Sequence, residues 1–500
     1  MARRDADSGD RRGDGPSDDV WSPAINRSSG PLYLAIADAM QADIARGALA
    51  AGTRLPSQRA LAARLGVDFT TVTRAYTEAR SRGLIDGKVG QGTWVREPGG
   101  DDRPAPDAAP PRRRVGQPPQ GRPPERAPER SGLIDMSMNL PPPVGDSELA
   151  ARMWDSIAAI GHEGGADLMM RYQEPGGAFQ DREAGALWLA PRLPGVDPAR
   201  ILACPGAQSA LLAACHALCA AGDAIAAGTL VYPGLIAAAK VLGLRLLPIA
   251  MDREGLLPDA FALACKTGAP RALYCNPTLS SPTTRTMSLQ RRQALLAIAA
   301  DHGVAIIEDD AYGALAPDAP PPLARLAPGR VIHIAGMAKS LAPALRVAWV
   351  AAPDIRSATR LGGAIGATTL MASPLTVAIA AAWIRNGVAD AVRDAIRAET
   401  AARVALARRI LPAECVAADS NAFHLWLEAP APWRGVDLAA RLRVAGVAAV
   451  PSEAFAIGPA PQQALRLGLG VPARRGDLER GLHIAADMLA REPEFAPGVV

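Results

Sequence analysis

The spacing of apolar residues separates a short N-terminal part of the chain from a long C-terminal part. Apolar side chains recur at helical spacing over 32–46, and two shorter periodic segments follow at 58–65 and at about 69–82. Ser57 is a suitable N-cap for the second segment, and Gly66 ends it. Two short helices joined by a tight turn that contains glycine predict a helix-turn-helix.

A β-hairpin is predicted directly after these helices. Leu84-Ile85 and Thr93–Val95 flank a glycine-rich turn over 87–92, which completes the pattern of a winged helix. We expect the third helix to enter the major groove of DNA and the hairpin tip to approach the adjacent groove or backbone. The expected DNA-contacting residues are Arg59, Thr70, Thr71, Thr73, Arg74, Lys88 and Gly90. The alternative is a winged helix that is used only for protein contacts.

Composition changes sharply on either side of this head. Residues 1–28 are polar and charged, residues 98–132 are dense in Pro, Gly and Arg, and neither segment has enough large apolar residues to form a core. We therefore predict a disordered tail over 1–28, a head domain over 29–97 and a linker over 98–132. Over 133–500, apolar strands alternate with Ala-rich helices, which predicts an α/β fold with a mainly parallel sheet.

Charge and cysteine content narrow the class of protein only slightly. The net charge of +4 over 500 residues does not by itself indicate nucleic-acid binding. The six cysteines form no Cys-x-x-Cys pair, so we expect reduced thiols and no metal site, and we interpret Cys215, His216 and Cys219 as part of a buried apolar helix. Neither a secretory signal nor a long apolar run is evident, so we expect a cytoplasmic protein without membrane contact.

Lysine is unusually scarce in this chain. Of the 54 basic residues only four are lysines, at positions 88, 240, 266 and 339. Arginine cannot form a Schiff base, so each lysine is a candidate for carbonyl chemistry. Lys339 comes just after the apolar strand 331–334, where open α/β sheets place their ligands. A lysine there predicts a site for pyridoxal 5'-phosphate (PLP), whose aldehyde needs such an amine.

PLP also requires an acid at its pyridine nitrogen, donors to its phosphate and ring oxygen, and a flat group over its ring. Asp309 follows the strand 305–307 and is our candidate for the pyridine nitrogen, because a buried acid needs a cation. The other candidates are Tyr312 for the ring oxygen, Tyr232 for stacking, and Ala207, Gln208 and Arg346 for the phosphate. Each residue also has an ordinary explanation as a surface charge, a capping group or a turn residue.

Two regions resemble known families. The run "GTRLPSQRALAARLGVDFTTVTRAYTEARSRGLIDGKVGQGTWV" resembles the GntR-type winged helix-turn-helix, and residues 133–490 resemble a fold-type-I aminotransferase domain with a small C-terminal α/β domain. Together the chain resembles the MocR branch of GntR-type regulators. The resemblance implies a homodimer that binds PLP. Its site residues would include Tyr172 of "RYQEPGG" at the partner subunit's phosphate, Ser281 at the ring oxygen, and Arg466 of "ALRLGLG" with Asn139 at an effector carboxylate.

The sequence departs from the family pattern at four positions. Phe69 stands where the family often has a DNA-contacting Arg, and Ser281 stands where it commonly has Asn. Gly336 replaces a Ser or Thr that donates to the phosphate, and Gly228 replaces a Glu. Because a lost hydrogen bond costs about 0.5–1.5 kcal/mol, we expect two lost contacts to weaken PLP binding about tenfold to a hundredfold.

These features favour a PLP-responsive regulator that binds a DNA operator with two half-sites. PLP would form an internal aldimine with Lys339, and an amino acid or amine effector would displace the lysine. The ligand must bind two states of the protein unequally for this to change DNA binding. The alternative is a working aminotransferase in which Lys339 also acts as the general base. A third interpretation is a DNA-binding protein whose large domain only supports dimerisation.

Overall fold

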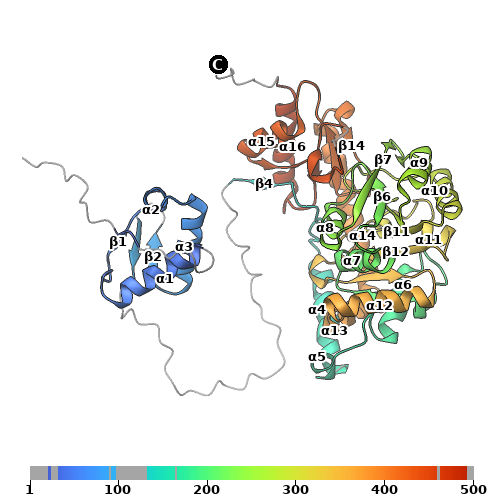
Figure 1. The fold of residues 1–500 in the computed structure, drawn as a ribbon, viewed down its shortest axis with the longest axis horizontal. Helices are drawn as coiled ribbons and strands as arrows, with labels where there is room; N and C mark the ends of the chain where they lie inside the picture. The colour runs from blue at the N-terminus through green and yellow to red at the C-terminus, as the bar shows by residue number, and fades with distance from the viewer. Residues whose placement is uncertain are drawn as a thin grey trace, which may run out of the picture. The chain divides into compact units, whose positions relative to one another are not determined.

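The computed structural model describes residues 21–23, 32–88, 92–96, 132–163, 166–458 and 462–491. The chain divides into two compact units, Met1–Gly121 and Arg122–Val500, and each is described by itself below (Figure 1). From the sequence we expect the winged helix in the first unit and the cofactor site in the second.

The first unit is a winged helix. Its elements are α1 (Leu32–Ala45), α2 (Gln58–Leu65), α3 (Phe69–Ser81), β1 (Arg54–Leu55), β2 (Ile85–Lys88) and β3 (Gly92–Val95). The predicted cap of α2 is confirmed, because the Ser57 hydroxyl accepts a hydrogen bond from the Ala60 amide at 3.2 Å and Gly66 ends the helix at φ +61°. The three strands form an antiparallel sheet in the order β1-β3-β2, and the pattern of apolar residues had not predicted β1.

The core of this unit is formed by side chains from all three helices and the hairpin. Buried residues include Ile36, Leu61, Val72 and Tyr76, and the Tyr76 hydroxyl donates to the Pro56 carbonyl at 2.8 Å. Trp21 packs against this core and its indole N–H donates to Asp43 Oδ2 at 2.8 Å. The head therefore includes Trp21, which the sequence pattern had placed in the tail.

The second unit is built on a seven-stranded sheet in the order β5-β13-β12-β11-β10-β6-β7 (Figure 1). The strands are β5 (Ile201–Cys204), β6 (Ala224–Gly228), β7 (Arg245–Ile249), β10 (Ala272–Cys275), β11 (Ala305–Asp309), β12 (Val331–Gly336) and β13 (Ala348–Ala351). Only β13 runs antiparallel to its neighbours, so the prediction of a mainly parallel sheet is confirmed. A small hairpin lies beside it, formed by β8 (Met251–Asp252) and β9 (Gly255–Leu256).

Helices cover both faces of this sheet. Alternate residues of β5 point into two separate cores, as the two-residue period of a strand requires. The core of one face includes residues of α6, α9, α10 and α13, and that of the other includes residues of α7, α8 and α12. The helices are α4 (Ser147–Glu163), α5 (Asp167–Met170), α6 (Phe179–Leu189), α7 (Ala207–Leu218), α8 (Pro233–Leu242), α9 (Pro258–Gly268), α10 (Leu289–Asp301), α11 (Leu323–Leu326), α12 (Ile355–Thr369) and α13 (Pro374–Arg385).

A smaller α/β subdomain with its own core completes this unit. Its antiparallel sheet has the order β14-β15-β18-β17, and a parallel pair joins β4 to β16. The strands are β4 (Ile134–Asp135), β14 (Val416–Ala417), β15 (His424–Glu428), β16 (Val447–Ala448), β17 (Val450–Pro451) and β18 (Ala464–Gly468). The helices are α14 (Val388–Ile410), α15 (Gly435–Val444) and α16 (Arg475–Leu489).

Three strand ends meet at one edge of the large sheet. In the parallel strands β10, β11 and β12, Cys275 pairs with Glu308 and Asp309 with Ile334, so their carboxyl ends lie side by side. The first turn of α7 packs against the same edge, where a Cβ added at Gly336 would lie 3.0 Å from the Ala207 Cβ. This edge is where an open α/β sheet binds its ligands.

Within the described part of the chain, no single helix is both long and apolar enough to cross a membrane, and only the sharply bent pair α13–α14 meets those criteria jointly, by length and composition alone.

Candidate cofactor site and DNA-binding face

Lys339 lies in the turn that follows β12, and its side chain is partly buried. Its ammonium nitrogen donates to the main-chain oxygen of Asn139, a residue 200 positions earlier in the sequence. Burial lowers the pKa of Lys339 to about 8, the positive charges of Arg466 and Arg346 act in the same direction, and Asp309 opposes them. A larger share of this amine is therefore neutral near physiological pH, which makes it a better nucleophile.

Asp309 is the last residue of β11 and is buried. The Tyr274 hydroxyl donates to its Oδ2 at 2.8 Å, while its Oδ1 is buried without a hydrogen-bond partner among the described residues. Burial raises the pKa of Asp309 to about 6, although the Tyr274 hydrogen bond partly opposes this effect. The unpaired oxygen is the position from which this carboxylate can accept a hydrogen from a ligand.

Two further acids at the end of β11 are neutralised within the protein. Glu308 accepts hydrogen bonds from the His333 ring at 2.9 Å and from the amides of Leu323 and Ala324 at 2.7 and 3.0 Å. Asp310 accepts from Arg192 Nε at 3.0 Å. The sequence had indicated Asp309 because a buried acid needs a cation. Of these three acids, Asp309 alone has no cationic hydrogen-bond partner. This favours Asp309 over Glu308 and Asp310 as the acid that faces the pyridine nitrogen.

Tyr312 is buried beside Asn139, whose side-chain amide donates to the Tyr312 hydroxyl at 2.6 Å. The Tyr312 ring also meets Phe423 edge to face, with centroids 5.8 Å apart. Burial raises the pKa of Tyr312 above its usual value, and the charge of Arg466 and the nearby Ser281 side chain partly offset this. Ser281 is therefore close enough to the Tyr312 hydroxyl to affect its pKa. The structure thus brings Asn139, Tyr312 and Lys339 together.

The start of α7 forms a cradle for an anion. The backbone at Gly206 has φ +87°, and a Cβ there would lie 2.9 Å from Nη2 of Arg346, so the guanidinium lies directly against the beginning of the helix. The helix begins at Ala207, so the backbone N–H groups of its first turn are free at this point. Gln208 donates from its side-chain amide to the Gly234 carbonyl at 2.9 Å. An N-terminal helix turn beside an arginine suits a phosphate.

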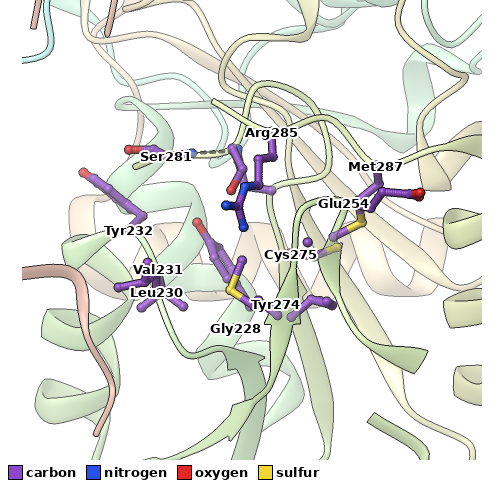
Figure 2. A pocket seen from close by; sticks show the side chains of 15 residues that line it. Gly228, Leu230, Val231, Tyr232, Glu254, Tyr274, Cys275, Ser281, Arg285 and Met287 are labelled. Carbon is purple, nitrogen blue, oxygen red and sulfur yellow. Dashed lines mark hydrogen bonds between the residues drawn. The ribbon is translucent and has the colours of Figure 1, made fainter. Parts of the chain in front are cut away.

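Two departures from the family pattern have packing explanations. A side chain at Gly336 would press on Ala207, so a small residue lets β12 approach α7 closely. At Gly228 a Cβ would lie 2.5 Å from the sulfur of Met251, which occupies the space that a glutamate would need. Figure 2 shows Gly228 at the wall of a small pocket that is also lined by Tyr232 and Tyr274.

Tyr232 directly precedes α8, and the residue is 38% exposed. Burial of its hydroxyl raises the pKa of Tyr232, and the charges of Asp309, Arg346 and Arg466 also affect it. These groups are therefore near enough to interact electrostatically with Tyr232. A partly exposed tyrosine within electrostatic reach of Asp309 can stack on a flat ligand.

Arg466 lies on β18 and faces the same group of residues. Its Nη2 donates to the Ser137 carbonyl at 2.7 Å, and its guanidinium lies 4.9 Å above the ring centre of Phe455. Its Nε is buried without a hydrogen-bond partner in the described part of the chain, and burial lowers the pKa of the guanidinium. A fixed guanidinium with a spare donor suits a carboxylate ligand.

Tyr172 is a cofactor-site candidate that makes no hydrogen bond, ion pair or ring contact with this group among the described residues. It lies in the segment between α5 and α6, and its side chain is 82% exposed. This exposure is consistent with the sequence-based expectation that Tyr172 acts in a partner subunit, which remains a prediction.

Sequence reasoning missed two side chains at this site. Tyr274 is one, because a tyrosine in the apolar strand "ALYC" looks like a core residue. His424 is the other: its ring lies 5.3 Å from that of Tyr312, and burial together with Arg466 lowers its pKa to about 3. His424 lies in the apolar run "FHLWL", where a histidine does not stand out as a binding residue.

These groups fit PLP. A lysine of lowered pKa, an unpaired buried carboxylate oxygen at Asp309, the tyrosine Tyr312 and an arginine against a helix N-terminus are the groups that this cofactor requires.

In the head, α3 carries the predicted DNA-contacting residues Thr70, Thr71, Thr73 and Arg74. The Thr73 hydroxyl donates to Gln58 Oε1 at 2.9 Å, and the exposed Arg74 guanidinium lies 4.6 Å from the ring centre of Tyr33. The other predicted contacts are only partly described. Arg59 and Lys88 lie in α2 and β2 and Thr70 in α3, with their side chains outside the described structure, and Gly90 lies outside the described residues.

Comparisons with known proteins agree with both units. Residues 32–95 match the gntR family of bacterial regulatory proteins, and residues 155–476 match the aminotransferase class I and II family. The uncharacterized HTH-type transcriptional regulator YdeF of Bacillus subtilis is 29% identical over 474 residues, which cover 94% of this chain and 96% of YdeF. The uncharacterized HTH-type transcriptional regulator YisV of the same species is 30% identical over 381 residues, covering 73% of this chain and 76% of YisV.

Solved structures resemble the second unit. LysN, the α-aminoadipate aminotransferase of Thermus thermophilus, is 26% identical with a TM-score of 0.65, covering 72% of this chain and 92% of LysN. The kynurenine aminotransferase of Pyrococcus horikoshii, at 23% identity, shares the fold with a TM-score of 0.66, covering 72% of this chain and 92% of that enzyme. The fold expected for this unit, and PLP as its cofactor, are thereby confirmed. The chain belongs to the aminotransferase class I and II family and carries a gntR-family head, which is the domain combination of a MocR-type regulator.

Proposed function

We propose that this protein is a cytoplasmic transcription regulator whose binding to DNA responds to PLP and to an amino acid or amine bound beside Lys339. The observation that carries the proposal is the contact of Lys339 and Tyr312 with Asn139. The described part of the second unit begins at Gly132, and Asn139 lies seven residues later. The segment that directly follows the predicted linker therefore contributes Asn139 to the cofactor site.

The cofactor site would work as follows. When bound, PLP supplies an aldehyde that reacts with amines and a pyridine ring that withdraws electrons. Lys339 would hold the aldehyde carbon, and Asp309 would accept a hydrogen from the pyridine nitrogen through its unpaired Oδ1. Tyr312 and Ser281 would serve the ring oxygen, and Tyr232 would stack on the ring. Ala207, Gln208 and Arg346 hold the phosphate at the start of α7, and Tyr172 completes that phosphate site in the other subunit of a homodimer.

Arg466 and Asn139 would recognise the effector. Arg466 has a spare donor on Nε, so it can bind the effector carboxylate in the forked geometry that guanidinium groups favour. Asn139 has a buried Oδ1 without a partner among the described residues, so it can accept a hydrogen from the effector amine. While Lys339 holds the cofactor, its amine would no longer donate the hydrogen bond to the Asn139 carbonyl, and an effector that frees this amine would let the bond form again.

The head would read DNA through α3 and the wing. Thr70, Thr71, Thr73 and Arg74 on α3 face the major groove, Arg59 contacts a phosphate, and Lys88 and Gly90 approach the backbone. A homodimer carries two heads and therefore reads two half-sites. A change in the segment after Gly132 alters DNA binding only if the ligand binds two states of the protein with different affinities.

The test is a titration of full-length protein against DNA from upstream of its own gene, with and without PLP, at one fixed salt concentration. We expect PLP to change the affinity or the footprint, and Lys339→Ala to abolish the change. Lys240→Ala is the control, because Lys240 is exposed on α8 and lies outside the site. Equal binding with and without PLP, and with PLP plus a panel of amino acids, contradicts the proposal and favours a large domain that only supports dimerisation.

Aminotransferase activity is the second candidate function. The lowered pKa of Lys339 favours it, because an amine with a pKa of about 8 can act as a base near neutral pH. The likeness to LysN, at 26% identity, points the same way. Sustained conversion of an amino acid and a keto acid by the wild type, lost in Lys339→Ala, would establish the enzyme function beside the regulatory one.

A further inference from the structure

A second cavity lies beside the turn that carries Lys339. It holds about 340 Å³ of space, which suits a ligand of several heavy atoms better than a single water molecule. Its wall includes Gly336 at the end of β12, Ser340 from that turn, the end of α6, the segment after β11, and one side of α14. Lys339, Asp309, Tyr312 and Arg466 do not line it. The cavity is therefore distinct from the cofactor site, although the two share one backbone turn.

The lining of this cavity is strongly cationic. Its lining includes one carboxylate, that of Asp310, and four arginine side chains. The arginines are Arg192, Arg325, Arg393 and Arg397. The aspartates that hold Arg393 and Arg397 do not line the cavity and are more than half exposed. They fix the two guanidinium groups from the solvent side, at 2.6 Å for Arg393 and 2.9 Å for Arg397.

Several guanidinium hydrogens remain available. Arg393 uses Nη1 and Nε on its aspartate partners, so its Nη2 makes no hydrogen bond to the described residues. Arg192 uses Nε on Asp310 and Nη2 on Thr278 and Pro320, which leaves Nη1. Arg325 is exposed at the rim, and no described residue forms an ion pair or hydrogen bond with its side chain.

The wall also contains an uncharged polar group that lacks a partner. Ser340 is 1% exposed, and its hydroxyl makes no hydrogen bond to any described residue. A buried hydroxyl without a partner costs free energy, and a ligand in the neighbouring cavity can satisfy it. The remaining wall is apolar and includes Trp188, Leu189 and several prolines, which suits the carbon part of a small molecule.

We propose that this cavity binds a small organic anion, with its carboxylate or phosphate group held by Arg192 and Arg393. Arg397, whose three guanidinium nitrogens donate to Leu315, Asp394 and Ala314, adds positive charge to the same wall. Binding there is independent of the carbonyl chemistry at Lys339, and so it does not rest on the proposed regulatory function. A guanidinium group can form paired hydrogen bonds with either a carboxylate or a phosphate. The experiment below therefore tests which of these two anionic groups the cavity binds.

The experiment is isothermal titration calorimetry on full-length protein saturated with PLP. The probes are glutarate for the carboxylate class and glycerol 3-phosphate for the phosphate class, and inorganic phosphate tests whether the organic part matters. We expect one class to bind at one site per chain. Affinity for it should fall at least about tenfold in Arg393→Gln/Arg397→Gln, because each charge-assisted hydrogen bond is strong. Arg409→Gln is the matched control, because Arg409 lies on the same helix with its side chain 69% exposed and does not line the cavity.

A second variant tests the cavity without changing the arginines, so that a folding defect in the double variant cannot be mistaken for loss of binding. Ala319→Leu fills part of the cavity but leaves every arginine in place. It should weaken binding of the preferred probe while the thermal unfolding midpoint stays close to that of the wild type. The proposal is overturned if no probe binds to the wild type, or if the probes bind equally well to the wild type, the double variant and Ala319→Leu.

Discussion

The chemistry of Lys339 is set by groups from distant parts of the chain. Burial and the guanidinium groups of Arg466 and Arg346 lower its pKa, while Asp309 raises it. The sequence pointed to Lys339 because lysine is scarce and because it follows an apolar strand. It did not indicate the size of this effect, which depends on β18 of the small domain approaching the end of β12.

The first prediction concerns pH. Because the pKa of Lys339 is lowered from 10.5 to about 8, the rate of PLP uptake should rise with pH and level off above about 8. Stopped-flow absorbance of added PLP across this range measures the midpoint. Arg466→Gln removes a nearby positive charge and should move the midpoint upward, whereas Arg466→Lys should leave it nearly unchanged. A midpoint that stays the same in both variants contradicts this electrostatic account.

The second prediction concerns Tyr274. Its hydrogen bond lowers the pKa of Asp309 against the larger effect of burial, which raises it to about 6. In Tyr274→Phe the pKa of Asp309 should rise further, so less of the carboxylate is charged near neutral pH. Because one hydrogen bond contributes about 0.5–1.5 kcal/mol, the Kd for PLP should increase about three- to tenfold.

Equilibrium titration of PLP at neutral and at alkaline pH checks this result. The defect should shrink at alkaline pH, where Asp309 is ionised in both proteins. Tyr33→Phe, in the head, is the control for loss of a phenol. A defect of equal size at both pH values would indicate a packing role for Tyr274 instead.

The sequence predicted most of the residues of the cofactor site but not Tyr274. Lys339, Asp309, Tyr312 and Arg466 occupy positions that a family pattern identifies, and the structure groups them together by contact or charge. The contact of Tyr274 with Asp309 depends on the pairing of β10 with β11, where Tyr274 lies opposite Ile307. Nothing in the strand sequence distinguishes this tyrosine from one that merely fills the core.

At the level of elements, the helices of the head were predicted well because their spacing and caps are local. The strand ends were predicted less well. β11 extends to Asp309 and β12 to Gly336, beyond the apolar runs that indicated them. Ladder hydrogen bonds to neighbouring strands support these extra residues, and such bonds are not visible in one segment alone. The two-residue strand β1 is formed by the same kind of pairing, with β3.

The third prediction concerns the beginning of α7. Gly206→Ala places a Cβ 2.9 Å from Arg346 Nη2 at a backbone with φ +87°, so the guanidinium must move away from the helix. We expect PLP affinity to fall about tenfold or more, because the arginine no longer shares the phosphate with the helix amides. Fluorescence titration with PLP measures the loss.

Gly195→Ala separates this effect from backbone strain. Gly195 has φ +71°, but a Cβ there would meet open space. Both variants should lose about 1–3 kcal/mol of unfolding free energy, because a residue with a side chain rarely adopts a positive φ. Only Gly206→Ala should lose PLP affinity, and an equal loss in Gly195→Ala would mean that general destabilisation explains the result.

At the scale of the whole molecule, exposed apolar side chains bear on the proposed homodimer. Trp154, Met169, Met170 and Tyr172 are between 69% and 82% exposed, and they lie on α4, α5 and the segment that follows. Both α4 and α5 pack on α13, so these elements are neighbours. Grouped apolar exposure of this kind is typical of an interaction surface.

The fourth prediction follows from this surface. Trp154→Glu places a charge among these side chains and should shift the protein toward monomers, because an unpaired charge is costly to bury in an interface. Light scattering coupled to size exclusion measures the mass. Val444→Glu is the control, because Val444 is 92% exposed on α15 of the small domain. Dimers of unchanged stability in both variants would place the interface elsewhere.

The backbone hydrogen bonds that position Asn139 limit where related chains can differ in length. Between Gly132 and Asn139 the backbone is held at several points: the amides of Ile134 and Met136 donate to Gly446 and Ala448, and the Gly468 amide donates to the Met136 carbonyl. Residues can be inserted before this segment without disturbing these contacts. A single residue gained or lost within it would move Asn139 away from both Lys339 and Tyr312. Among related chains, length should therefore vary freely on one side of Gly132 and hardly at all on the other.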